Sequence, residues 1–346
     1  MVRIAAADHE LSTVAKVIRG RDGTIWISQP QDGNIIHFAA NARRLGVVGR
    51  KGEGPGEFQA VGGMQDTDRG LVVFDPMLRR VTTFAASGRV AATRALTRPA
   101  ALPPAAFVVA GDAKQAVYIH YPTPPSTATQ GAGKFRSVPV FLASLGGESL
   151  STLVVSDGRF CSLQVQRGNG VVGAGIPYCH ADRWGVSSNL KYHAIATPTP
   201  VASGSTGFEL LVVSSRGDTV TRSRHLLGPS PIPGRVRDSV IDALPARSRE
   251  PGLAAEMIRG GLIPHTYPPV TEVAVSDDGD VWVTTRSGPT GSKGALVVLR
   301  GGRELGYTPL PRTSWVRWVG QSEGLIVEED ADGLQDVVLY RARARK

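Results

Sequence analysis

Histidine side chains are the first candidates for chemistry in this sequence, because imidazole is a common metal ligand and a general base near neutral pH. The seven histidines are scattered along the chain, and none stands in an HExxH pattern. His120, His180 and His193 are the ones that a fold could bring to a shared site. A core or rim position for each is the more ordinary interpretation. We therefore predict no catalytic residue, no metal ligand and no cofactor.

Two glycine motifs match catalytic or nucleotide-binding patterns by letter. Gly168–Gly173 has the form G-x-G-x-x-G, and Gly320–Gly324 has the form G-x-S-x-G. The first pattern requires its last glycine to open a helix, and the second requires a strand, a sharp turn and then a helix. Strand-like residues follow both motifs here, for example Leu325–Val327 after the second. Both motifs are therefore predicted to be hairpin turns.

The balance of charge is basic. The chain of 346 residues has 39 Lys and Arg against 30 Asp and Glu, a formal net charge of +9. Such a surface favours acidic proteins or anionic lipid headgroups, although solvated arginines alone would give the same balance. Nucleic acid is disfavoured, because aromatic residues are only 6% of the chain and form no stacking platform among the cations. The compact basic cluster is the tail Arg341, Arg343, Arg345 and Lys346, an electrostatic tether or a frayed end.

The sequence does not select a cellular compartment for the protein. No stretch approaches the roughly 20 apolar residues that a membrane-spanning helix needs. Met1–Arg3 is followed by the polar Asp8–Glu10, without the apolar region of a secretory signal. A removed signal would leave the same start, so a position against a bacterial membrane could be cytoplasmic or periplasmic.

Two cysteines, Cys161 and Cys179, flank a turn at Arg167–Gly170. A hairpin there would bring them close, though out of direct register. A disulfide and two buried thiols are both compatible with this spacing, and we favour the thiols.

A repeated pattern of short β-rich runs separated by Gly, Asp and Pro turns is the main structural signal. Gly23–Ser28, Gly70–Asp75 and Gly279–Thr284 each start one such series of strands. Evenly spaced short strands predict antiparallel meanders, which bury both faces by packing around an axis. Six units follow: Val14–Gly49, Gly63–Leu96, Ala106–Val155, Trp184–His225, Val270–Leu310 and Trp315–Arg341.

The last unit has only three good strands, and Val2–Ala6 can supply the fourth. An N-terminal strand there would close the ring and remove two exposed edges. We therefore predict an all-β fold, a six-bladed β-propeller, as a single domain over residues 1–346. Insertions are expected at about 121–135, 157–183 and 229–269, with helical patches in the last of these.

The segment Val48–Phe58 resembles a recurring link of NHL-like six-bladed bacterial propellers. Val73–Asp75 and Tyr267–Val270 fit the same family, and the resemblance is poor between about 100 and 265. It implies the fold and little about function, because propellers host hydrolases, lyases, sugar-binding modules and inert platforms. Phe58 is expected to anchor the link in the core.

The leading functional hypothesis is a non-enzymatic interaction platform. Such a protein would be a peripheral or scaffolding subunit of a larger complex that could be membrane-bound, respiratory or photosynthetic for example. Long insertions in a rigid ring are common binding sites. Arg183 and Trp184, beside one insertion, and the tail cations Arg341, Arg343, Arg345 and Lys346 are the candidate contacts.

The alternative is a metal-assisted hydrolase or lyase, or a small-ligand binder, that uses the central channel. The first strand of each blade would line that channel. As placed from the sequence, these strands carry little acid and no histidine, which favours the platform.

Overall fold

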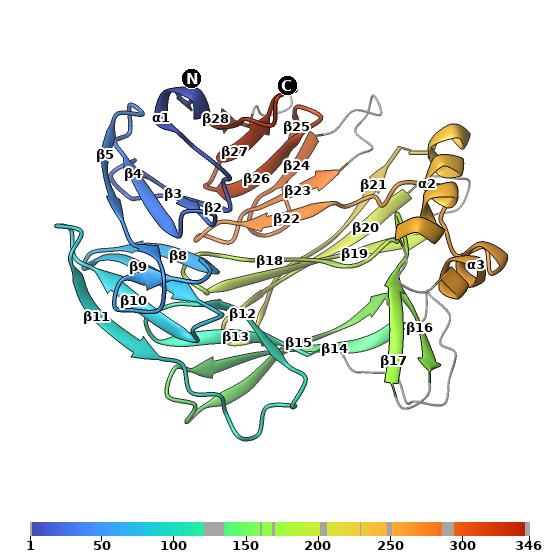
Figure 1. The fold of residues 1–346 in the computed structure, drawn as a ribbon, viewed down its shortest axis with the longest axis horizontal. Helices are drawn as coiled ribbons and strands as arrows, with labels where there is room; N and C mark the ends of the chain where they lie inside the picture. The colour runs from blue at the N-terminus through green and yellow to red at the C-terminus, as the bar shows by residue number, and fades with distance from the viewer. Residues whose placement is uncertain are drawn as a thin grey trace.

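The computed structural model describes residues 2–120, 135–159, 161–167, 170–200, 206–228, 230–247, 251–285 and 294–342. Six four-stranded antiparallel sheets stand around a common axis, as Figure 1 shows. This confirms the predicted six-bladed β-propeller.

Each of the first three blades runs from the axis outward. Blade one contains β2 (Lys16–Arg19), β3 (Ile25–Gln29), β4 (Asn34–Phe38) and β5 (Arg44–Val48). Blade two contains β8 (Gly63–Thr67), β9 (Gly70–Asp75), β10 (Arg80–Phe84) and β11 (Val90–Ala95). Blade three contains β12 (Phe107–Gly111), β13 (Gln115–Ile119), β14 (Phe135–Ser144) and β15 (Leu150–Arg159).

The other three blades complete the ring. Blade four contains β18 (Arg183–Val186), β19 (Tyr192–Pro200), β20 (Thr206–Ser214) and β21 (Thr219–Leu227). Blade five contains β22 (Glu272–Val275), β23 (Val281–Thr285), β24 (Gly294–Val298) and β25 (Glu304–Pro309). Blade six contains β26 (Ser314–Val319), β27 (Glu323–Glu329) and β28 (Gln335–Arg341), followed in the sheet by β1 (Arg3–Ile4). Blades three and four extend a few residues beyond the predicted limits.

Burial explains why the strands differ in composition. The second strands β3 and β23 are buried along their whole length, because neighbouring blades cover both of their faces. A strand buried on both faces has apolar residues in consecutive rather than alternate positions, as in Ile25–Ile27 and Val281–Val283. The outermost strand β11, by contrast, is exposed at all of its residues.

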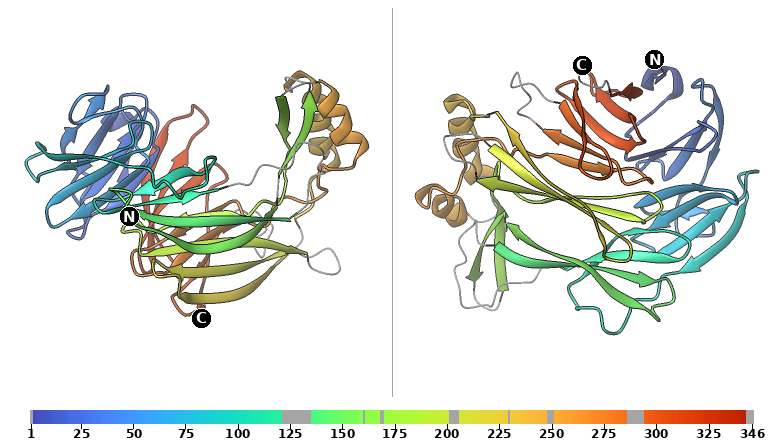
Figure 2. Two further views of the ribbon diagram at one scale, coloured as in Figure 1. Left: turned by 90° about the horizontal axis from the view of Figure 1, so that it is seen from below. Right: turned by 180° about the vertical axis from the view of Figure 1, so that it is seen from behind.

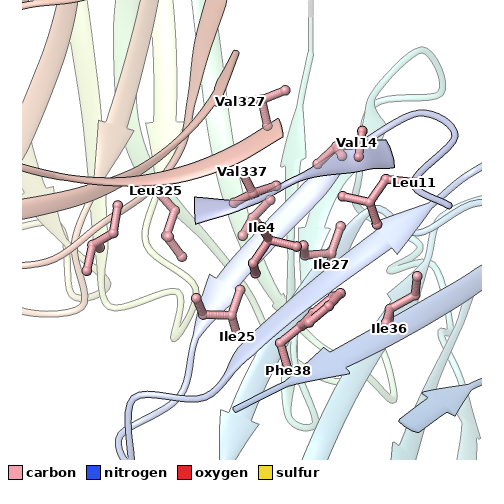
Figure 3. Close-up of a cluster of buried hydrophobic side chains, with 13 residues drawn as sticks. Ile4, Leu11, Val14, Ile25, Ile27, Ile36, Phe38, Leu325, Val327 and Val337 are labelled. Atoms are coloured by element: carbon pink, nitrogen blue, oxygen red, sulfur yellow. The ribbon is translucent and has the colours of Figure 1, made fainter. Parts of the chain in front are cut away.

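The N-terminal strand closes the ring as predicted. Arg3 is paired with Val338 and Ile4 with Val337 across the β1–β28 junction. Ile4 is completely buried, and Figure 3 shows it among side chains from both ends of the chain, including Ile27 and Val337. The short helix α1 (Ala6–His9) then leads from blade six to blade one. Segments near both ends of the described chain therefore share one core.

The link after blade one is structural. Its strands β6 (Arg50–Lys51) and β7 (Glu57–Phe58) pair in parallel, and Phe58 is 1% exposed. The carboxylate of Glu57 accepts a hydrogen bond from the Gly54 N–H at 2.8 Å. The Arg80 guanidinium donates to three carbonyl groups of the link, those of Glu53, Gly54 and Glu57. The predicted core position of Phe58 is confirmed.

An insert stands at one side of the ring in all the views of Figures 1 and 2. It comprises the hairpin of β16 (Ser162–Arg167) and β17 (Gly170–Gly175) with the helices α2 (Gly234–Arg247) and α3 (Pro251–Arg259). Leu163, Ile176, Leu253 and Met257 form its own small core. Among the described residues, no helix is long and apolar enough to span a membrane. The expected loop at 121–135 lies outside the described residues except for residue 135.

Cys161 and Cys179 form a disulfide, with their Cα atoms 5.5 Å apart. The preference for two thiols was therefore wrong. Ile176 N–H donates to the Cys161 carbonyl, and Cys179 N–H donates to the Ile176 carbonyl. The chain therefore turns after β17 and brings Cys179 next to Cys161, although their spacing in the sequence placed the two residues out of register.

Candidate functional site

A cavity of about 510 Å³ lies at the axis of the ring, where the innermost strands of all six blades meet. Its volume is in the range that suits a small-molecule ligand. Its wall is mostly small and apolar, as expected from the sequence, and includes Val17, Gly63, Ala110, Val186 and Ala274. No histidine is among the lining residues.

Four charged residues interrupt this apolar wall: Lys16, Arg183, Glu272 and Arg317. Three cations against one carboxylate leave an excess of two positive charges. Lys16 and Arg317 lie within the innermost strands predicted at Val14–Ile18 and Val316–Val319, but neither was predicted as a site residue. Arg183 and Glu272 begin β18 and β22, just before the innermost strands predicted to start at Gly185 and Val273. Arg183 had been predicted as a contact residue, and the signal that could have found the other three is a charge in an otherwise apolar innermost strand.

Arg317 and Glu272 connect the last two blades. Their side chains form an ion pair with 3.7 Å between Arg317 Nη1 and Glu272 Oε1. The other carboxylate oxygen of Glu272 accepts the Val316 N–H at 3.2 Å. The Arg317 guanidinium also lies over the Trp315 ring, 5.8 Å from its centre. These contacts fix the position of Arg317 at the cavity wall.

Lys16 has a different environment. Its backbone N–H donates to Ser28 Oγ at 2.9 Å, which anchors the residue in blade one. Within the described ranges, no hydrogen bond or ion pair engages its ammonium group. The side chain is open to the cavity, yet protein surrounds it, and this enclosure lowers the pKa of Lys16. The nearby charge of Arg317 lowers the same pKa further.

Two guanidinium nitrogens at the cavity wall are buried without an acceptor. The Nε atoms of Arg183 and Arg317 have no hydrogen-bond partner in the part of the chain that the structure describes. A buried donor without an acceptor costs about 1–3 kcal/mol, and more when the group is charged. A bound anion would remove that cost, because carboxylates and phosphates accept such bonds from guanidinium groups. The geometry therefore suits an anionic ligand.

A second cavity of about 320 Å³ adjoins the first at the insert. Arg183 and Thr271 line both cavities. The disulfide of Cys161 and Cys179 forms part of its wall. Tyr178 and Tyr267, with ring centres 5.2 Å apart and nearly perpendicular planes, also line it. The insert thus borders the region beside the axial cavity.

The candidate contact residues fall into two groups. Arg183 and Trp184 line the axial cavity, and Trp184 is half-buried against the core shared by blades three and four. Arg341 lies at the end of β28, with its Nε 3.9 Å from a carboxylate oxygen of Glu323. Arg343, Arg345 and Lys346 lie outside the described residues. The structure therefore does not bring the two groups into one described site.

The three histidines singled out in the sequence do not share a site. His193 is fully buried, and its Nε2–H donates to the Leu190 carbonyl at 3.1 Å. His180 Nε2 lies 3.1 Å from the Thr266 carbonyl oxygen in the insert. His120 Nδ1 is buried without a hydrogen-bond partner in the described chain. Over the described ranges, no group of three or more His, Cys, Asp or Glu residues could hold a metal ion.

Solved structures similar to this chain are β-propellers of low sequence identity. A member of the DUF4221 family from Bacteroides vulgatus has a TM-score of 0.51 and 10% identity, over 99% of this chain and 97% of that chain. Regucalcin, a calcium-binding protein from Agrobacterium tumefaciens, has a TM-score of 0.37 and 11% identity, over 97% of this chain and 95% of that chain.

Virginiamycin B lyase from Staphylococcus aureus has a TM-score of 0.31 and 11% identity, over 99% of this chain and 88% of that chain. No protein-family model and no curated protein sequence matches the chain. At these identities the likeness concerns the fold alone, and it agrees with the six-bladed β-propeller seen here.

Proposed function

We propose that this protein binds a small organic anion in its axial cavity. The observation that carries the proposal is the pair of buried Nε–H donors, on Arg183 and Arg317, that have no acceptor in the described chain. The unpaired ammonium of Lys16 lines the same cavity. An anion would satisfy these donors and balance the excess positive charge.

The surroundings strengthen such binding. Apolar walls lower the local dielectric constant, so each charge–charge contact is stronger than it would be at an exposed surface. Glu272 is the single carboxylate among the lining residues, and its ion pair holds Arg317 in place. A ligand with one or two carboxylate or phosphate groups would match the cavity in charge and size.

Isothermal titration calorimetry with succinate, citrate and inorganic phosphate tests this proposal. Lys16→Met and Arg317→Met should each weaken binding of the best ligand by about tenfold or more, the usual cost of losing a charge-assisted hydrogen bond. Lys51→Met, which changes an exposed lysine in the link after blade one, is the matched control. Binding that is absent for all three anions, or equal in all variants, would overturn the proposal.

An NHL-like affiliation belongs to the same proposal. It is supported by the sequence of the link Val48–Phe58, which is held by the buried Phe58 and by the hydrogen bond from Gly54 N–H to the Glu57 carboxylate. The alternative of a hydrolase or lyase remains compatible with a ligand in this cavity. A metal-assisted version would need ligands beyond those that the described residues bring together.

A protein-docking role is the second candidate, and the insert is the feature that favours it. The insert projects at one side of the ring (Figure 2), and Ile258 on α3 is 41% exposed there. The net charge of +9 would favour an acidic partner. Such a partner could be another subunit of a larger complex in which this protein is a scaffolding subunit. The propellers reported above add no support for this role.

Purification of the tagged protein in mild detergent, followed by mass spectrometry of co-eluting chains, tests docking. We expect a stoichiometric partner that Ile258→Asp releases. Met77→Asp, at a 70% exposed side chain of blade two, is the matched control and should retain the partner. Recovery of the protein without a partner would count against this role. Co-elution of the partner with both variants would count against it as well.

A further inference from the structure

Lys16 differs from an ordinary anion-binding lysine in having no anionic neighbour of its own. Glu272, the carboxylate that lines the cavity, forms an ion pair with Arg317 and accepts the Val316 N–H. The ammonium of Lys16 faces the cavity without a hydrogen bond in the described chain. Its other charged neighbours at the cavity wall are cations, Arg183 and Arg317.

We propose that Lys16 forms a reversible imine with the carbonyl carbon of a small oxo acid, whose carboxylate is held by Arg317. This inference rests on the proposed anion-binding function and adds to it the class of ligand. Arg317 offers a guanidinium whose Nε–H lacks an acceptor, and guanidinium groups bind carboxylates through paired hydrogen bonds. Lys16 offers an amine in the same cavity.

The protonation state of Lys16 favours this chemistry. Only the neutral amine is a nucleophile, and enclosure by apolar walls or a neighbouring cation is how proteins produce it near neutral pH. Both causes act on Lys16, since the surrounding protein lowers its pKa and Arg317 lowers it further.

The reaction balances without any further reagent. The lone pair of Lys16 Nζ forms a bond to the carbonyl carbon as the carbon–oxygen π bond breaks, and the nitrogen gives up a proton while the oxygen takes one up, which yields a neutral carbinolamine. The carbinolamine loses its hydroxyl group with a proton as one molecule of water, which leaves a carbon–nitrogen double bond. Hydrolysis reverses each step and releases the oxo acid. Water in the cavity can carry the protons.

Cyanoborohydride trapping tests the inference, because hydride reduces an imine to a stable secondary amine. The chain has only seven lysines, so peptide mass spectrometry can follow each site. With pyruvate as the probe, we expect Lys16 to gain the mass of pyruvate less one oxygen atom. Labelling at Lys16 should be about tenfold faster than at the exposed Lys51, in keeping with an activated amine.

Two controls separate the role of the Lys16 amine from the role of the Arg317 guanidinium. Acetone has the carbonyl group without the carboxylate, so it should label Lys16 more slowly than pyruvate does. Arg317→Gln should reduce that difference, because it slows the pyruvate reaction more than the acetone reaction. Loss of the Arg317 charge raises the Lys16 pKa for both probes alike, whereas loss of the carboxylate contact affects pyruvate only. The inference would be overturned if labelling of Lys16 were no faster than labelling of Lys51. It would also be overturned if acetone labelled Lys16 as fast as pyruvate does.

Succinate binding by the wild-type protein distinguishes failure of this inference from failure of the proposed function. Succinate has two carboxylates but no ketone that could form an imine with Lys16, so its binding by the wild-type protein reports on the anion site alone. If the wild-type protein binds succinate but pyruvate never labels Lys16, the anion site stands and the imine is refuted. If neither occurs, both proposals fail.

Discussion

The guanidinium of Arg317 lies 3.7 Å from the carboxylate of Glu272, and this pair joins the innermost strands of blades five and six inside the axial cavity. The carboxylate also accepts the Val316 N–H, so it is held by both blades. The pair orients Arg317 and at the same time reduces the positive charge of the cavity. The negative charge of Glu272 should therefore weaken anion binding, although Glu272 also positions Arg317, which binds the anion.

Replacement of Glu272 by Gln tests this double role. Gln keeps an oxygen that can accept the Val316 N–H, so the loss in free energy of unfolding should stay below about 1 kcal/mol. Affinity for the best anion should rise by about three- to tenfold, because the cavity gains one net positive charge. Calorimetry measures the affinity, and Glu10→Gln at an exposed site is the control. A lower affinity in Glu272→Gln would show that orientation outweighs charge.

Ring closure depends on Ile4, which is completely buried between the two ends of the chain (Figure 3). Ile4→Ala should lower the free energy of unfolding by about 2–5 kcal/mol, the usual cost of deleting a buried aliphatic group. Arg3→Ala removes exposed ion pairs with Glu328 and Asp336 and should cost less than about 1 kcal/mol. Denaturant titrations measure both. Equal losses in the two variants would contradict a closure held by the apolar contact.

The disulfide stabilises the insert rather than the ring. It closes a loop with a sequence separation of 18 residues, for which the loss of chain entropy predicts about 3 kcal/mol. In a Cys161→Ser, Cys179→Ser variant, hydrogen exchange of the β16 and β17 amides should accelerate. Exchange of the β3 amides in blade one should remain as in the wild type. Faster exchange across the whole ring would show that the disulfide contributes to global stability.

His193 should make stability depend on pH. Burial lowers its pKa from 6.5 to about 4 in the folded protein. Between those values the unfolded chain binds a proton that the folded chain does not, so acidification favours unfolding. The free energy of unfolding should fall by about 3 kcal/mol as the pH drops from 6.5 to 4.

Chemical denaturation at several pH values in that range measures this effect. The fall should be smaller in His193→Gln, because glutamine does not titrate, and the exposed His265→Gln should resemble the wild type. Carboxylates protonate in both proteins, so the difference between wild type and variant isolates His193. Identical pH profiles for His193→Gln and the wild type would refute this assignment.

Much of the architecture could be predicted from the sequence, because blade strands are specified locally. Continuous apolar runs such as Ile25–Ile27 follow from burial on both faces, and turn residues between the runs mark the hairpins. The missing fourth strand of blade six could be assigned to Val2–Ala6 by counting strands alone. The anchoring role of Phe58 followed from its place after a glycine-rich link.

The site could not be predicted in the same way. Lys16, Arg183, Glu272 and Arg317 come from four different strands, β2, β18, β22 and β26, and are as much as 301 residues apart. No spacing rule relates them, since the rotation of each blade about the axis brings them together. The free Nε donors of Arg183 and Arg317 appear only when the surrounding side chains are in place.

The two cysteines also show the difference between what the sequence predicts and what the tertiary structure decides. Their positions on either side of a turn predicted proximity, but the direction of the chain after β17 decides whether the two sulfur atoms meet. By itself, the sequence determined the repeat, the strand order and the closure, because these depend on local patterns of burial and turns. Only the tertiary structure decided which charges share the axial cavity and which cysteines are joined, because both depend on contacts between distant segments.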